Sequence, residues 1–495
     1  MSPLANHPAQ YRSLSLHFLG LMLWCFSPLV GSTPSMTTSP MAKQLLQISN
    51  SGAGSVSLVC PRKGPPSTRP SAPVAEPTEI PDDDEVAQAL QEASAERTAP
   101  TDLPGQRLQG DPRGWRIAVW GDSHMAAAFF TDQMVRQLVP DAAPATSRFV
   151  HAGVGHGGVR ALVRKTCLSG NWGREMAYAH ADAAAAPGPG MTSLVAKRHG
   201  ATLAMDLRDA QGLARHTQLK ILHHGDGAGL TRLGIRVDGE AETLVSLDPS
   251  AGPHALALET RAPLSTLQIR VIEGAFRFQG LKLPETPAPA TSVLHLDLFA
   301  YPGATMAGWV RSDLDYLSSW FTDQAYDLAL IAFGTNEGND PRFNEDAYRD
   351  MLTLALGNFR RVFPQTQCVL IGPGDRGIRV VKSRTNKRPK GANANSQSPQ
   401  KQPTAQSKTA KTAPTAQLLK YARIHERIGQ IQADLAAQHG CQAWSMQAAM
   451  GGVGSAYTWA RKSPALMAPD LIHFTSAGYR ELANSFMVDF GLAKP

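Results

Sequence analysis

The strongest constraint on the fold is an alternation of short apolar runs with longer amphipathic segments. The runs are too short for helices and are bounded by glycine or polar turn residues, so they predict buried strands. They lie at 116–120, 148–151, 293–298, 326–333, 367–371 and 441–445. Helical periodicity is clearest at 344–362, where Asn344 can cap the first turn and Pro364 follows the last. Alternating strands and helices predict a parallel sheet with helices on both faces.

A second pattern interrupts this alternation. Six short alternating runs follow one another between 191 and 285, separated by turn signals such as Asp238-Gly239. Such spacing is typical of a β-sandwich rather than of strand–helix units. We therefore expect a small β-sandwich domain at 191–285, inserted between two parts of an α/β domain at 114–190 and 286–495.

The N-terminal segment has the composition of targeting and linker sequences. Residues 1–32 place Arg12 before an apolar stretch and end in small residues, which is the pattern of a secretory signal peptide cleaved near Ser32. Residues 33–113 are rich in Pro, Ser, Ala and acidic residues and predict a disordered linker, with one short helix near 85–96. We expect an exported protein of the periplasm or cell envelope, without a transmembrane span after signal cleavage.

Export leaves four cysteines, Cys60, Cys167, Cys368 and Cys441. Four cysteines allow three pairings, and an oxidising compartment permits disulfides without requiring them. Cys368 and Cys441 each open a predicted strand, so a bridge between neighbouring strands and a pair of buried free thiols both fit. The sequence leaves the pairing open.

The basic charge is concentrated in one segment. The chain of 495 residues carries 48 Lys and Arg against 41 Asp and Glu, a net charge of +7. Ten of the basic residues, and no acidic ones, lie in 376–417, and without them and Arg12 the remaining net charge is −4. Nucleic-acid binding therefore has no basis in the folded domains. We expect 376–417 to be a disordered basic loop that holds the protein to an anionic envelope polymer.

Chemically useful residues follow several of the predicted strands. Ser123 follows the first strand, and Gly303 and Asn336 follow later ones. Ligands of open parallel sheets bind beyond the carboxyl ends of the strands. We therefore expect these residues to converge on one edge of the sheet.

Ser123 has the partners that a serine nucleophile requires. A serine hydroxyl needs a neighbouring base, and the base needs a third group to orient it. Asp470 lies three residues before His473, so it can bond one ring nitrogen while the other faces Ser123. The backbone N–H groups of Ser123 and Gly303, with the Asn336 amide, can supply an oxyanion hole.

In this order, the blocks resemble those of the SGNH (GDSL-type) hydrolases. The matching segments are Gly-Asp-Ser-His at 121–124, Gly303 in Tyr-Pro-Gly-Ala, Gly-Thr-Asn-Glu at 334–337 and Asp-Leu-Ile-His at 470–473. The resemblance implies a flavodoxin-like three-layer α/β sandwich around a parallel sheet, with Ser123, His473 and Asp470 as the catalytic triad. The family's usual Gly-x-Asn-Asp ends here in Glu337, whose role is left open.

Within this superfamily, the chain is similar to bacterial peptidoglycan O-acetylesterases. The likeness includes the Gly-Asp-Ser-His start, the stretch at 445–452 and the inserted carbohydrate-binding-like β domain. It implies an exported serine esterase that removes O-acetyl groups from cell-wall glycan through an acetyl-serine intermediate. A polysaccharide O-acetyltransferase, a deacetylase of another polysaccharide such as xylan or alginate, and a noncatalytic wall-binding module are the alternatives. The β domain either binds glycan or only walls the cleft.

Other conspicuous side chains have simpler explanations. We expect no cofactor and no catalytic metal, because metal-ligand spacing is lacking around His151, His156, His223 and His224. We expect local hydrogen bonds for His124. Tyr457 and Trp459 are expected to pack in the core or a loop, with stacking on a sugar ring as the alternative.

Overall fold

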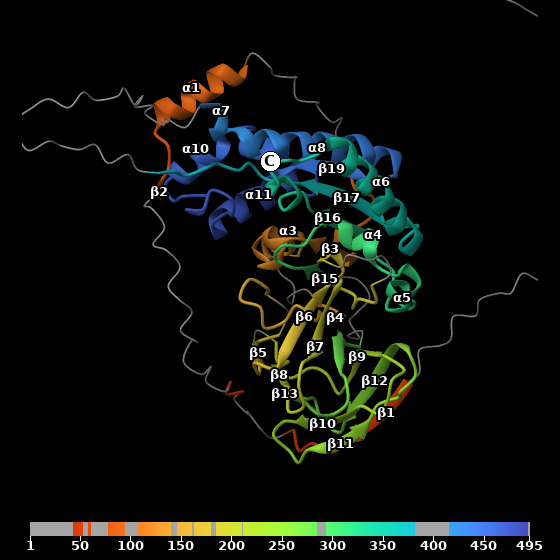
Figure 1. Ribbon diagram of the computed structural model, residues 1–495. Coiled ribbons are helices and arrows are strands. Elements are labelled where there is room, and N and C mark those ends of the chain that lie inside the picture. Colours follow the sequence, from red (N-terminus) through yellow and green to blue (C-terminus); the bar gives the residue numbers. More distant parts are fainter. Residues whose placement is uncertain are drawn as a thin grey trace, which may run out of the picture. The chain divides into compact units, whose positions relative to one another are not determined.

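The computed structural model shows a mixed α/β protein with several sheets (Figure 1). It describes residues 43–52, 58–60, 78–94, 107–139, 146–160, 163–179, 185–209, 211–284, 294–381 and 415–493. Within these residues lie a five-stranded parallel sheet, a seven-stranded sheet that is mostly antiparallel and a five-stranded antiparallel sheet.

The parallel sheet carries the sequence blocks singled out above. Its strands are β3 (Arg116–Gly121), β15 (His295–Ala300), β16 (Leu328–Ala332), β17 (Gln367–Gly372) and β19 (Gln442–Ser445). Numbered along the chain, they lie in the order 2-1-3-4-5, and every neighbouring pair is parallel. The ends of β15, β3 and β16 are therefore adjacent on one edge of the sheet.

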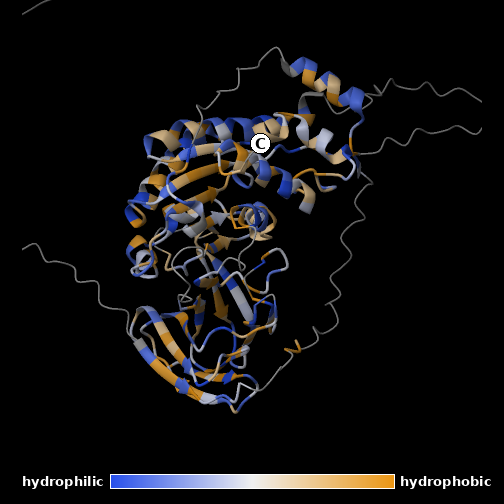
Figure 2. Cartoon of the chain, turned by 180° about the vertical axis from the view of Figure 1, so that it is seen from behind, coloured by the Kyte–Doolittle hydropathy of each residue, from blue (hydrophilic) through white to orange (hydrophobic). Residues whose placement is uncertain are grey.

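Side chains of this sheet alternate between two hydrophobic cores. In β3, Ile117 and Val119 enter one core, and Ala118 and Trp120 enter the other. The first core is closed by α3 (Phe129–Leu138), α9 (Met446–Met450), α10 (Ser455–Arg461) and α11 (Ser476–Asp489). The second is closed by α4 (Ala307–Arg311), α5 (Leu314–Ser319), α6 (Glu345–Val362) and α8 (Lys420–Gln438). Helices thus pack on both faces, and Figure 2 shows mostly hydrophobic strands beside helices of mixed hydropathy.

The remaining large sheets share a third hydrophobic core and are called the β region here. The seven-stranded sheet contains β1 (Lys43–Ile48), β12 (Gly252–Thr260), β9 (Gln218–Gly225), β14 (Arg277–Lys282), β7 (Thr192–Ala196) and β6 (Trp172–Met176) in that order, with β4 (Phe149–His151) beside β14. The five-stranded sheet contains β11 (Thr243–Ser246), β10 (Arg232–Val237), β13 (Thr266–Glu273), β8 (Thr202–Asp206) and β5 (Lys165–Leu168).

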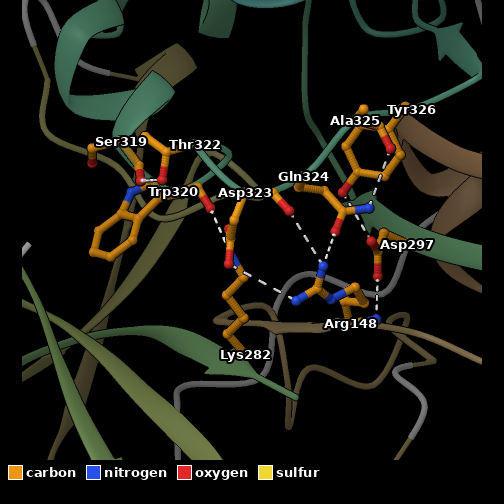
Figure 3. Close-up of polar contacts among 10 residues, drawn as sticks. All are labelled: Arg148, Lys282, Asp297, Ser319, Trp320, Thr322, Asp323, Gln324, Ala325 and Tyr326. Atoms are coloured by element: carbon orange, nitrogen blue, oxygen red, sulfur yellow. Dashed lines mark hydrogen bonds and ion pairs between the residues drawn. The ribbon is translucent and has the colours of Figure 1, made fainter. Parts of the chain in front are cut away.

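A partly buried polar cluster, in which Lys282 and Gln324 are buried and Asp323 is exposed, joins the β region to the segment that precedes β16 (Figure 3). Lys282 at the end of β14 donates hydrogen bonds to Asp323 and, at 3.1 Å, to the carbonyl oxygen of Trp320. Arg148 donates to the Gln324 side chain at 2.8 Å. A buried charge is costly without a partner, so these contacts fix the two segments together.

The β region extends beyond the predicted 191–285. The run at 148–151, predicted as a strand of the α/β alternation, is β4 and pairs with β14 instead. Just before it, Thr146 forms a bridge with His295 of the parallel sheet, so the chain leaves that sheet within a few residues. A strand of only three residues, two of them apolar, fits either sheet, and only the long-range pairing decides between them.

The prediction of a linker without regular structure at 33–113 is wrong for the parts that are described. β1 pairs in parallel with β12, and Cys60 forms a disulfide with Cys167. The short helix predicted near 85–96 is present as α1 (Asp83–Ser94). The partners of β1 and Cys60 lie far along the chain, where local composition gives no indication of them.

Two further local predictions need correction. The Ala-rich apolar segment at 125–138 predicts a single helix, but it is broken into α2 (Ser123–Ala126) and α3, because Ala128 adopts a left-handed φ of 62°. The first residues of the predicted disordered loop at 376–417 are ordered, and β18 (Val380–Val381) pairs with β2 (Thr78–Glu79). Residues 382–414 lie outside the described residues.

A second disulfide joins Cys368 of β17 to Cys441, directly before β19. It links two neighbouring parallel strands, as one of the two alternatives for these cysteines proposed. Among the described helices, none has the length and apolar character needed to cross a bilayer.

Candidate active site

Ser123 lies at the turn between β3 and α2. The Asp122 carboxylate caps this helix by accepting the His124 N–H at 2.9 Å, and the Asp122 N–H donates to the Ala332 carbonyl oxygen of β16 at 3.1 Å. Burial raises the pKa of Asp122 to about 6. The turn therefore holds Ser123 at the carboxyl edge of the sheet, as the sequence predicted.

Ser123, His473 and Asp470 form a continuous hydrogen-bonded chain. The Ser123 Oγ lies 2.9 Å from His473 Nε2, and His473 Nδ1 lies 2.8 Å from Asp470 Oδ2. Both distances are those of ordinary hydrogen bonds. The structure thus brings together three residues from opposite ends of the chain in the order that the sequence predicted.

The loop with Asp470 and His473 is held by its own backbone. Asp470 Oδ1 accepts the N–H groups of Ile472 at 3.0 Å and His473 at 2.9 Å. Leu471, which directly follows Asp470, is buried and adopts a left-handed φ of 57°. Burial alone would raise the pKa of Asp470, but the hydrogen bonds from His473 and Ile472 lower it below its usual value. The carboxylate is therefore ionised and fixed toward the imidazole.

Gly303 and Asn336 follow the two strands that flank β3. Gly303 has a φ of 83°, which favours glycine, and its N–H has no hydrogen-bond partner among the described residues. Asn336 Nδ2 donates one hydrogen to the Ala304 carbonyl oxygen at 2.9 Å. A side-chain amide has two N–H donors, so this bond orients the Asn336 amide and leaves one donor for a ligand.

Glu337 ties these two loops together. Its Oε1 accepts the Met306 N–H at 2.8 Å, and its Oε2 accepts the Gly334 N–H at 3.1 Å. Burial, with a smaller contribution from the Asp122 charge, raises the pKa of Glu337 to about 7 against the effect of these hydrogen bonds. The residue whose role the sequence left open is thus a bridge between the Gly303 loop and the Asn336 loop.

His124 lies behind the hydrogen-bonded chain. Its ring centroid is 5.5 Å from that of His473, and its Nδ1 is 3.2 Å from the Tyr479 hydroxyl. Burial lowers the pKa of His124 to about 3, so its ring is neutral. The local hydrogen bond expected for His124 is made by its backbone N–H, which donates to Asp122, while its ring contacts Tyr479 of α11.

Several other residues noted in the sequence are structural. Tyr457 and Trp459 are buried, and the Tyr457 hydroxyl accepts the Ile378 N–H at 2.8 Å, so packing is the correct alternative. Asp375 is buried and accepts the Gln447 side chain and the Ala456 N–H, both at 2.8 Å. It therefore holds α9 and α10 rather than facing a ligand.

Sequence reasoning missed Arg376 and the bridging contacts of Glu337. Arg376 was assigned to the basic loop, but it follows β17 directly after Asp375 and contacts Asn339 and Tyr421. Its position just after a strand end was the available signal. Within the described ranges, no group of three His, Cys, Asp or Glu side chains is arranged to hold a metal ion.

Comparisons with known proteins agree with this architecture. No protein-family model matches the chain, and a search of curated proteins finds no match. A solved structure of a peptidoglycan O-acetylesterase aligns over 82% of this chain and 94% of its own, with 18% identity and a TM-score of 0.51. The chain has the SGNH hydrolase fold. The fold predicted from the order of the sequence blocks is therefore confirmed.

Two other solved structures match less well. A GDSL-like lipase from Parabacteroides merdae has 14% identity and a TM-score of 0.26, covering 40% of this chain and 74% of its own. A family two carbohydrate esterase from Clostridium thermocellum has 9% identity and a TM-score of 0.25, covering 66% and 100%. At these TM-scores neither adds to the argument from the SGNH hydrolase fold.

Proposed function

We propose that the protein is an exported serine esterase that removes O-acetyl groups from cell-wall glycan. The observation that carries the proposal is the hydrogen-bonded chain of Ser123, His473 and Asp470 at the carboxyl edge of the parallel sheet. The fold shared with a peptidoglycan O-acetylesterase supports the choice of substrate.

Acylation begins at Ser123. Its Oγ attacks the acetyl carbonyl carbon while its proton passes to His473 Nε2, and the carbonyl π electrons move onto oxygen. Asp470 stabilises the imidazolium through Nδ1. The 2.9 Å contact between Oγ and Nε2 supports this direct proton transfer.

The oxyanion requires donors that are already in place. We assign this role to the N–H groups of Ser123 and Gly303 and to the remaining N–H of the Asn336 amide. Ser123 is the first residue of α2, so its N–H is free of helix hydrogen bonds. Asn336 is oriented by Ala304 and its loop by Glu337, which supports a preorganised hole.

Collapse of the tetrahedral intermediate breaks the bond from the acetyl carbon to the sugar oxygen. His473 returns its proton to that oxygen, which releases the sugar hydroxyl and leaves acetyl-Ser123. A water molecule then attacks the acetyl carbon, gives its proton to His473 and releases acetic acid as the Ser123 Oγ recovers the proton. The exposed rim beside His473 is therefore the side of the sugar leaving group.

The domain architecture is part of the proposal. We propose that the part of 114–190 that precedes β4, together with 286–495, forms a flavodoxin-like three-layer sandwich, which the strand order 2-1-3-4-5 supports. The β region is then an inserted, carbohydrate-binding-like domain. A cavity of about 340 Å³ lined by Gln218, Lys220 and Glu259 on its strands supports a glycan-binding role.

Export and envelope attachment complete the proposal. The signal-like residues 1–32 and the two disulfides support an oxidising compartment outside the cytoplasm. The basic segment would bind an anionic envelope polymer. Deletion of 382–414 should then weaken binding to sacculi at low salt, whereas unchanged binding would make this segment a neutral insertion.

The direct test is acetate release from O-acetylated peptidoglycan, acetylated xylan and acetylated alginate by wild type and Ser123→Ala. The proposal predicts fastest release from peptidoglycan and none above background from the variant. Faster release from another polymer would identify that polymer as the substrate. Predominant transfer of the acetyl group to a chitooligosaccharide would favour an O-acetyltransferase. Binding to sacculi without acetate release would leave only a wall-binding module.

A further inference from the structure

Arg376 lies between the two halves of the candidate active site. Its Nη1 donates a hydrogen bond to the Asn339 side chain, three residues after Asn336. On the other side, the N–H of Gly377 donates to the Leu471 carbonyl oxygen at 3.0 Å, inside the loop that carries Asp470. Arg376 is therefore fixed at the rim between the Asn336 loop and the loop with Asp470 and His473.

The guanidinium of Arg376 is held but not neutralised. It stacks on the Tyr421 ring, with 4.1 Å from the guanidinium carbon to the ring centroid. No carboxylate of the described residues lies within ion-pair distance, and neither Nε nor Nη2 has a hydrogen-bond partner among them. The residue is only partly buried, and so are Asn339 and Tyr421. The side chain of this fixed cation is thus partly accessible beside the site, although its Nε atom is buried.

The position of Arg376 relates it to the leaving group rather than to the acetyl group. His473 must protonate the oxygen of the departing sugar, so this sugar lies beside the loop that carries His473. Arg376 is anchored to that same loop through Gly377. Burial lowers the pKa of Arg376 overall, although the nearby Tyr421 and Asp470 act in the opposite direction. An arginine guanidinium stays charged at physiological pH.

We propose that Arg376 binds a carboxylate carried by the sugar unit from which the acetyl group is removed. This inference rests on the proposed esterase function and narrows its substrate class to acidic glycans. A planar guanidinium matches the two oxygens of a carboxylate. A carboxylate carries one negative charge, which balances the single positive charge of Arg376 and leaves no excess negative charge near Asp470. The carboxylate could belong to a lactyl or peptide group of peptidoglycan or to a uronic acid.

The substrates that test this inference differ in their carboxylates. O-acetylated peptidoglycan is compared with the same material after its carboxylates have been amidated, and acetylated alginate is compared with a neutral acetylated xylan. A neutral aryl acetate reports the chemistry alone. Wild type should show a KM at least tenfold lower for the peptidoglycan than for its amidated form. A low KM for alginate alone would assign the carboxylate to a uronic acid.

The variants are Arg376→Met, which removes the charge, and Arg376→Lys, which keeps it without the planar stack. Arg342→Met is the control, because Arg342 is an exposed arginine paired with Asp340 beyond the Asn336 loop. We expect Arg376→Met to raise KM about tenfold or more on the acidic substrate, with kcat/KM on aryl acetate within about twofold. Arg376→Lys should lie between it and wild type, and Arg342→Met should match wild type.

The outcomes separate this inference from the proposed function. Equal losses of Arg376→Met on aryl acetate and acidic glycan would show a structural role and overturn the carboxylate subsite, while the esterase would stand. Unchanged KM values for every substrate would also overturn it. If wild type hydrolyses aryl acetate but no acetylated glycan, the glycan esterase itself fails and the subsite fails with it.

Discussion

The two sides of the candidate active site are built in different ways. The base side, Asp470 to His473, is one short loop in which the hydrogen bonds of the Asp470 side chain all lie within four consecutive residues, with further backbone bonds to Ala468 and Gly377. The oxyanion side combines the ends of three strands, and its Gly303 and Asn336 loops are joined by contacts from Asn336 to Ala304 and from Glu337 to Met306 and Gly334. One side is local, and the other depends on tertiary structure.

This difference has a functional consequence. Alignment of the base depends mainly on hydrogen bonds inside its loop, with one backbone bond from the distant Gly377, so few distant substitutions should disturb it. Alignment of the oxyanion donors depends on Glu337, which need not touch substrate. Substitutions on the base side should therefore remove activity directly, whereas Glu337 should act through the positions of other groups.

The largest effect is expected for Ser123→Ala. Removal of the nucleophile should reduce kcat on aryl acetate by a factor on the order of 10⁴ or more, because the remaining groups cannot act without it. Circular dichroism should show an unchanged fold, since Ser123 is only partly buried. A loss of less than about tenfold would contradict the assignment.

Asp470→Asn should have the next largest effect. The amide cannot stabilise the imidazolium and favours the wrong tautomer, so we expect kcat to fall by roughly 10³ to 10⁴. Steady-state kinetics with aryl acetate measures this directly. A variant that keeps most of its activity would show that the base side does not need its third member.

Asn336→Ala tests the oxyanion side. Loss of one donor to the developing oxyanion should lower kcat by about 10² with little change in KM, because the interaction forms only in the transition state. If KM rises instead while kcat is kept, Asn336 binds the ground state and is not part of the hole.

Glu337→Gln should have a smaller effect on the same parameter. An amide can accept only one of the N–H groups of Met306 and Gly334, so the two loops should loosen and kcat should fall by roughly tenfold. Glu345→Gln is the matched control, because Glu345 is exposed and pairs with Arg427. Equal activity of Glu337→Gln and the control would show that the bridge is unnecessary.

The pH dependence of stability gives the smallest expected effect. The pKa of Glu337 in the folded protein is about 7, above its ordinary value, so the folded state holds this proton more tightly than the unfolded state. Its contribution to stability should therefore fall as pH rises from about 4.5 to 7 and then level off. The Tm of wild type should lose a few degrees relative to Glu337→Gln between pH 5 and 8. Parallel Tm curves would contradict this.

Much of the base side and of the parallel sheet could be predicted from the sequence. The apolar composition of runs such as 326–333 predicts a buried strand, which the structure contains as β16. Asn344 caps the start of α6, as predicted. The contact between the Asp470 carboxylate and the His473 ring could be predicted from their three-residue spacing, because it depends on the local backbone. These features are encoded over short distances.

The missing features depend on contacts between distant segments. β1 has an unremarkable composition, and only its pairing with β12 makes it a strand. Glu337 could be recognised as a departure from a family pattern, but the Met306 and Gly334 N–H groups that it accepts become neighbours only when β15 and β16 flank β3. Arg376 could not be distinguished in the sequence from the many other basic residues of the segment that follows it.

The most direct test of the central claim is to trap the acetyl group on Ser123. O-acetylated peptidoglycan with isotopically labelled acetyl groups is mixed with the protein, quenched in acid and digested for mass spectrometry. We predict one labelled acetyl group per chain, on the peptide that contains Ser123, and none in Ser123→Ala. Release of labelled acetate with no acetylated Ser123, or a label on another residue, would contradict the account.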